Sequence, residues 1–192
     1  GQLTKVNKLS QGVPYVLTEK ISGSALSGEM LYTTDADYHG LSGAQGLKLV
    51  NSFDINEAPV WYFDGSHLLY GSPAGSDNYL VYNSSNQIAL GGVNEANIFD
   101  SIGLYDASAS SFVLFASGMS SGGTRYYLNQ YGGTSYNVAG LWHYASSSQW
   151  CFNEWIPERT ITMKVMPNLS RMTVGQTAQL TTTVTVNGNT AS

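Results

Sequence analysis

The chain has 192 residues, a net charge of −5 and only 11% charged side chains, against 42% hydrophobic ones. This composition excludes a disordered polypeptide, which would combine low hydrophobicity with high charge. Residues 21–158 contain twelve acidic side chains and two basic ones, which argues against nucleic acid and anionic membrane surfaces as partners. No apolar run approaches the roughly 18 residues that a membrane span needs, so we expect no membrane insertion.

The first predicted elements belong to one repeat unit. Residues 1–11 are polar and are predicted to be an N-terminal linker or a short lead-in strand, and an apolar strand is predicted at 15–18. A second strand follows around Leu31, and an aromatic run at 59–65 closes the unit. The segment between them is Gly-rich at its start, which is typical of a loop insertion. We assign residues 12–65 to this first repeat.

The same order of features recurs twice along the chain. Repeat two covers residues 66–111 and repeat three covers residues 112–156, and each opens with an apolar strand and closes with an aromatic run. Leu31, Leu80 and Leu128 fall at equivalent places, 49 and 48 residues apart. The closing runs align at Phe63, Tyr105 and Phe152. Four short strands in each unit predict about twelve strands and an all-β fold.

The repeats resemble a β-trefoil, in which three four-stranded units of about 40 to 50 residues close into a barrel with a hairpin cap. The resemblance covers residues 12–156 and rests on repeat spacing. Because no unit could bury its apolar face alone, the three copies are expected to close on one another. A three-bladed or sandwich arrangement of the same strands is the alternative.

The composition changes after Trp155, and residues 157–192 are predicted to form a linker and part of another domain. This segment resembles the start of a bacterial immunoglobulin-like domain of the Big-2 type, as in large Gram-positive surface proteins. The residues that match are Val165, Pro167, Val174, Gly175, Gln176, Thr177 and Leu180. The fold expected for the whole chain is therefore a β-trefoil-like repeat followed by a partial Ig-like β segment. We expect the C-terminal strands to pack on the first domain or to pair with a second copy.

No sequence motif indicates catalysis. G-x-S-x-G, H-E-x-x-H, the P-loop and a metal-binding pair of cysteines are all absent. His39, His67 and His143 lie in separate repeats, and the acidic pair at 35–37 lacks the rest of a calcium loop. We therefore predict no enzymatic activity in this chain, no metal site and no cofactor.

Cys151 is the single cysteine, so the chain has no internal disulfide. It lies between Trp150 and Phe152 in a closing strand, where a small buried hydrophobic side chain is expected. The alternative is a Cys–Gln thioester like those of some Gram-positive adhesins, but the Thr-Gln motif of those domains is missing.

Aromatic, acidic and amide side chains near the inner turn of each repeat form the candidate binding site. Sugars stack an apolar face on aromatic rings while carboxylate and amide groups bind their hydroxyls. The candidates, three from each repeat, are Asp37, Tyr38, His39, Asn83, Asn86, Gln87, Tyr131, Tyr136 and Asn137. β-Trefoil lectins hold sugars at this turn, although the ricin-type Gln-x-Trp signature is not met at Gln149 and Trp150. The structural alternative is that these residues only form turns and barrel caps.

These features predict a non-catalytic binding module of a secreted or cell-surface bacterial protein of the Gram-positive type. Its expected ligand is carbohydrate, from host mucin or a dietary glycan. A protein-binding adhesin or a structural spacer contacting a host surface protein is one alternative, because tyrosine and tryptophan supply anchors at protein interfaces. An accessory domain of a larger glycan-active enzyme is the other.

Overall fold

The computed structural model describes residues 1–32, 45–82, 87–94, 97–99, 101–121, 124–130, 137–158, 161–167, 174, 180–186 and 189–190. The chain divides into two units, Gln2–Ile156 and a smaller one that contains Pro157–Ser192. The elements among these residues are strands and two short 3-10 helices, without an α-helix. The predicted all-β class is confirmed.

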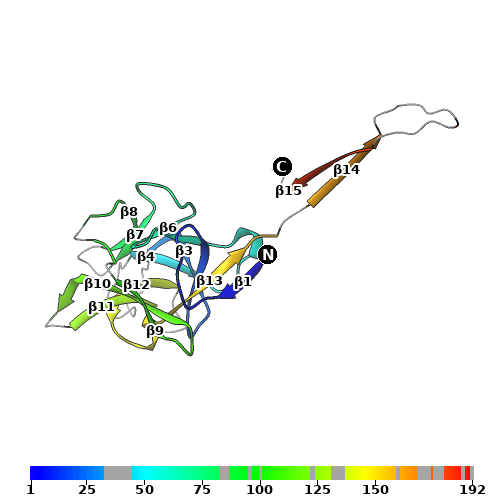
Figure 1. The fold of residues 1–192 in the computed structure, drawn as a ribbon. Coiled ribbons are helices and arrows are strands. Elements are labelled where there is room, and N and C mark those ends of the chain that lie inside the picture. Colours follow the sequence, from blue (N-terminus) through cyan, green and yellow to red (C-terminus); the bar gives the residue numbers. More distant parts are fainter. Residues whose placement is uncertain are drawn as a thin grey trace. The chain divides into compact units, whose positions relative to one another are not determined.

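The described part of the larger unit contains one system of thirteen antiparallel strands and two 3-10 helices. The strands are β1 (Gln2–Lys5), β2 (Pro14–Glu19), β3 (Ala25–Tyr32), β4 (Gln45–Val50), β5 (Val60–Phe63), β6 (Leu68–Tyr70), β7 (Tyr79–Tyr82), β8 (Ile88–Gly91), β9 (Ser101–Asp106), β10 (Ser111–Ser121), β11 (Thr124–Gln130), β12 (Val138–His143) and β13 (Trp150–Ile156). The 3-10 helices are η1 (Ile55–Glu57) and η3 (Ser146–Ser148). In Figure 1, β10 and β11 run side by side, and β1 lies along β13, with which it pairs.

Six strands follow one another as antiparallel neighbours. β5 pairs with β6 and β2, β13 pairs with β2 and β10, and β10 pairs with β9. The order is therefore β6-β5-β2-β13-β10-β9. The two end strands, β6 and β9, form no pairing with each other in the described part of the chain. This leaves an open seam between β6 and β9.

Three hairpins carry the same pair of leucines on facing strands. In β3–β4, β7–β8 and β11–β12 these cross-strand pairs are Leu26 with Leu49, Leu80 with Leu90, and Leu128 with Leu141. The predicted equivalence of Leu31 with Leu80 and Leu128 was therefore wrong, because Leu26 takes that place. The register of β3 shifts between Leu26 and Met30, so equal spacing along the sequence does not mark equal positions in this longer hairpin.

Two buried tryptophans connect the closing strands to the hairpins. The indole Nε1 of Trp61 in β5 donates to the carbonyl of Leu26 at 2.8 Å, and that of Trp150 in β13 donates to the carbonyl of Leu128 at 2.9 Å. Both side chains are fully buried. A buried indole N–H needs such a partner, so each tryptophan fixes a closing strand against its own hairpin.

The registers also correct the alignment of the closing strands. In each case a buried leucine of an opening strand faces a closing strand, and for the first repeat this is β13, the closing strand of the last repeat. These pairs are Leu17 with Phe152, Leu68 with Phe63, and Leu114 with Ile102. Ile102, and not Tyr105, is therefore the counterpart of Phe63 and Phe152. Tyr105 is 53% exposed, which its spacing from Phe63 and Phe152 along the sequence did not reveal.

Among its described residues, the smaller unit contains three strands in one antiparallel sheet. β14 (Ile161–Pro167) pairs with β15 (Leu180–Val186), which pairs with β16 (Asn189–Thr190). Three of the residues that carry the Big-2 resemblance, at positions 175–177, lie outside the described residues. No helix in the described part of either unit is long and apolar enough to cross a membrane.

Candidate functional site

Most of the predicted site residues lie outside the described residues. These are Asp37, Tyr38, His39, Asn83, Asn86, Tyr131 and Tyr136. Gln87 is half-buried immediately before β8. Asn137 is exposed immediately before β12, and its backbone carbonyl accepts a hydrogen bond of 2.7 Å from the N–H of Leu49. The sugar sites expected at the inner turns remain predictions.

A row of aromatic rings crosses β9, β10 and β11 and ends immediately after β12. Its four members, which we call the aromatic row, are Tyr105, Tyr144, Tyr127 and Phe115. The ring centroids are 5.2 Å apart for Tyr105 and Tyr144, 5.8 Å for Tyr144 and Tyr127, and 5.4 Å for Tyr127 and Phe115. Tyr105 and Tyr144 are 53% and 42% exposed. Phe115 and Tyr127 are half-buried, so two exposed rings continue into two half-buried rings through successive contacts.

Strand alternation places these rings on the outer face. Leu114 and Leu128 are fully buried, so their neighbours Phe115 and Tyr127 point to the opposite side of the sheet. Phe115 and Tyr127 are also direct partners in the register of β10 and β11. Their contact is therefore fixed by the backbone and does not depend on a loop.

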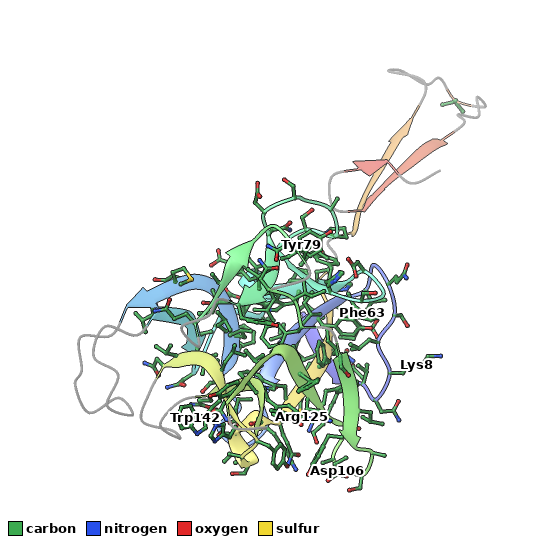
Figure 2. All side chains as sticks on the ribbon, turned by 90° about the vertical axis from the view of Figure 1, so that its left-hand side faces the viewer. Lys8, Phe63, Tyr79, Asp106, Arg125 and Trp142 are labelled. Carbon is green, nitrogen blue, oxygen red and sulfur yellow. The ribbon has the colours of Figure 1, made fainter. Side chains whose placement is uncertain are left out.

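Further rings and a cation lie beside the aromatic row. The guanidinium carbon of Arg125 lies 5.3 Å from the ring centroid of Phe115. Trp142 stacks on His143 at 4.9 Å, and His143 stacks on Tyr126 at 5.1 Å. Figure 2 shows Trp142, Arg125 and Asp106 along one margin of the larger unit, away from Tyr79.

A polar network fixes the exposed end of the row. The side-chain amide nitrogen of Gln149 donates to the Tyr144 hydroxyl at 3.0 Å. The amide oxygen of Gln149 accepts hydrogen bonds from Lys20 Nζ at 2.9 Å and Ser111 Oγ at 2.8 Å. Tyr144 is therefore oriented by a residue that is itself held in place, which reduces the conformational entropy lost on binding a ligand.

The pKa values of two titratable groups at this end, Tyr105 and Asp106, are shifted in opposite directions. A hydrogen bond with the Tyr144 hydroxyl is the main cause that raises the pKa of Tyr105 above its usual value, so the phenol stays neutral. The hydrogen bond from the Ser108 hydroxyl, helped by the Ala109 N–H, holds the pKa of Asp106 below its usual value. Neutral hydroxyls beside an ionised carboxylate suit recognition of a ligand that carries hydroxyl groups.

His39 lies outside the described residues, while the surroundings of His67, His143 and Cys151 are described. His67 Nδ1 lies 3.2 Å from Asp64 Oδ2, and His143 lies within a ring stack. Across the described ranges there is no group of three or more His, Cys, Asp or Glu side chains that could hold a metal ion. Cys151 is 3% exposed, so its predicted burial is confirmed.

The aromatic row was not among the sites predicted from sequence. Its signal is present at two positions, because Phe115 and Tyr127 alternate with apolar core residues and so had to face outward. Tyr105 and Tyr144 carried no such signal. Comparison with known proteins found no matching family model, curated protein or solved structure. The functional interpretation therefore depends on the geometry of the site.

Proposed function

We propose that the larger unit is a non-catalytic module that binds carbohydrate through the aromatic row. The observation that carries this proposal is the contact between exposed Tyr105 and Tyr144, held in place by Gln149 and bordered by Asp106. Sugars present apolar faces that stack on such rings, and their hydroxyls pair with carboxylate and amide groups. Host mucin and dietary glycans are the proposed sources of the ligand.

The finer fold that we propose for this unit is a β-trefoil. Three observations support it: the row of six neighbouring strands, the leucine pair repeated in three hairpins, and the two equivalent tryptophan hydrogen bonds. An experimental structure in which residues 12–65, 66–111 and 112–156 superpose about a common axis would support the assignment. Units that do not superpose would refute it.

We also propose that the parent protein is secreted or displayed on the surface of a Gram-positive-type bacterium. The sequence resemblance of residues 165–180 to a Big-2 domain supports this, and so does the antiparallel pairing of β14 with β15. Cell fractionation with an antibody against the larger unit tests the proposal. Signal confined to the cytoplasmic fraction would contradict it.

A glycan array that includes mucin and plant sugars tests the binding function. We expect the double variant Tyr105→Ala/Tyr144→Ala to bind roughly tenfold or more weakly than the unchanged chain, because aromatic anchors dominate such contacts. Tyr79→Ala is the matched control, since Tyr79 lies away from the row (Figure 2). The proposal would be overturned if the unchanged chain bound no glycan on the array, or if the double variant bound as strongly as the unchanged chain.

A protein partner is the second candidate, and the exposure of β9 favours it. Leu104 and Tyr105 are 43% and 53% exposed, and β9 pairs with β10 alone among the described strands. A free strand edge can accept an extended peptide from another protein. If this is the function, Leu104→Lys will abolish capture of a protein from serum or mucosal secretions. Glycan binding by the same variant would then be unchanged.

A further inference from the structure

A small cavity lies at the open seam between β6 and β9. It has a volume of about 280 Å³ and is lined by Phe63 of β5, by Gly65 and Ser66 of the following turn, and by Ser101 and Ile102 of β9. The lining therefore comes from the two sides of the gap between β5–β6 and β9. Neither β6 nor β9 pairs across this gap within the described ranges.

One lining residue of the cavity, Ser66, has a buried aromatic residue at the equivalent position of the other two repeats. Leu17, Leu68 and Leu114 are equivalent, since each faces a closing strand, at Phe152, Phe63 and Ile102 respectively. Two positions before these leucines stand Tyr15, Ser66 and Phe112. Tyr15 and Phe112 are 2% and 3% exposed, and their rings contact Phe152 edge-on at 5.8 and 5.0 Å. Ser66 supplies no ring, so Phe63 lacks the neighbour that Phe152 has.

The backbone keeps this place open. Asp64 Oδ1 accepts hydrogen bonds from the N–H groups of Ser66 at 2.8 Å and His67 at 2.7 Å, and the Asp64 N–H donates to the His67 carbonyl at 3.1 Å. Gly65 has a φ of 109°, which other residues rarely adopt. The β5–β6 hairpin therefore turns at Gly65 and Ser66. At the equivalent positions of the other two repeats, Tyr15 and Phe112, the opening strand is still paired with its closing strand. The cavity is a consequence of this turn.

The chemistry of the lining selects for a polar ring. Phe63 offers an aromatic surface, while the hydroxyls of Ser66 and Ser101 are exposed and hydrogen-bond to no other residue in the part of the chain that the structure describes. None of the five lining residues is charged. Cavities that bind drug-sized molecules start near 300 Å³, so this one suits a single ring and not an oligomer.

We propose that the seam cavity binds one neutral sugar ring, such as the terminal residue of a glycan. The ring stacks on Phe63 and exchanges hydrogen bonds with Ser66 and Ser101. This inference shares with the proposed function only the class of ligand, because the cavity is a separate site. Phe63 lies clear of Arg125 and Trp142, which mark the side of the aromatic row (Figure 2).

The test is an NMR titration of the full, isotope-labelled chain with the methyl glycosides of glucose, galactose, mannose, N-acetylglucosamine and N-acetylgalactosamine. We expect at least one of them to produce saturable shifts at the five lining residues. Ser66→Phe restores the ring found in the other repeats, so it should weaken these shifts roughly tenfold or more by filling the site. Its unfolding temperature should not fall.

Two further variants keep the outcome decisive. If Ser66→Phe does not fold, Ser66→Ala/Ser101→Ala removes only the hydroxyls and should also weaken binding. Tyr105→Ala/Tyr144→Ala should leave the cavity shifts unchanged, so failure of the aromatic row and failure of the cavity are distinguishable. The proposal is overturned if none of the five glycosides shifts the lining residues. It is equally overturned if the shifts persist undiminished in the filled or hydroxyl-free variant.

Discussion

Trp61 and Trp150 each place an indole N–H in the core, with one backbone carbonyl as its partner. Replacement by phenylalanine keeps a ring but removes the buried indole donor of the hydrogen bond to the carbonyl of Leu26 or Leu128. We expect each of Trp61→Phe and Trp150→Phe to lower the free energy of unfolding by about 1–3 kcal/mol. Chemical denaturation measures the loss. Tyr62→Phe, at a half-buried position on the face of β5 opposite Trp61, is the control, and an equal effect there would show that the loss does not come from the indole hydrogen bonds.

The turn between β5 and β6 depends on Gly65. Its φ of 109° is unfavourable for any residue with a Cβ, so Gly65→Ala should cost about 1–3 kcal/mol of stability. A Cβ there would also meet the amide nitrogen of Gln11, but that side chain can move aside. Gly103→Ala is the matched control, because a Cβ at residue 103 meets nothing within 4 Å. Thermal unfolding of both variants checks this, and equal stability would count against a strained turn.

The charge of Asp64 contributes to stability in a defined pH range. Burial acts to raise the pKa of Asp64, but hydrogen bonds from the His67 and Ser66 N–H groups and from the His67 ring outweigh it, and the pKa is lowered. The folded chain thus keeps this charge to a lower pH than the unfolded chain. The stabilisation is complete above the unfolded pKa of about 3.9 and is lost as the pH falls through the folded pKa.

Asp64→Asn tests this pH dependence, since asparagine retains an oxygen that accepts the same backbone hydrogen bonds. We expect the unchanged chain to be the more stable one at neutral pH, and the difference in unfolding temperature to shrink on acidification below about pH 4. Thermal scans at several pH values provide the measurement. A difference that stayed constant down to strongly acidic pH would show that the charge has no such role.

At the level of elements, the three hairpins are defined by their leucine pairs. Leu26, Leu80 and Leu128 are all buried, whereas Leu31 is half-buried. We expect Leu26→Ala and Leu128→Ala each to cost about 2–5 kcal/mol, the range for truncating a buried leucine. Leu31→Ala should cost clearly less. Denaturation curves compare the variants. A larger loss of stability for Leu31→Ala than for Leu26→Ala would contradict Leu26 as the counterpart of Leu80 and Leu128.

Strand type and order were predictable from sequence, but strand register was not. The opening strand at 15–18 and the strand at 79–82 are present as β2 and β7, because alternation of apolar side chains is a local property. Leu31 and Tyr105 were misaligned because a shifted register in β3 and a displaced β9 change the spacing without changing the composition. Only the facing strand reveals such a shift.

At the level of the molecule, the larger unit should fold without the smaller one. Gln2–Ile156 contains all thirteen paired strands, and β1 pairs with β13 as far as Ile156. A chain of residues 1–156 should therefore unfold in one cooperative transition with intact near-ultraviolet circular dichroism. Loss of cooperativity would show that the second unit completes the fold of the first. Ending the chain at residue 150 is the informative contrast, since it removes β13.

The sequence by itself determined the all-β class, the order of the strands and the burial of Cys151, because alternation, turn composition and the placing of apolar residues are encoded locally. It also indicated three related segments. Only the tertiary structure decided that Leu26 is the counterpart of Leu80, that Tyr105 and Tyr144 meet on the surface, and that Ser66 stands where the other repeats have a ring. These features join residues far apart along the chain through backbone register, and nothing in a single segment specifies its partner.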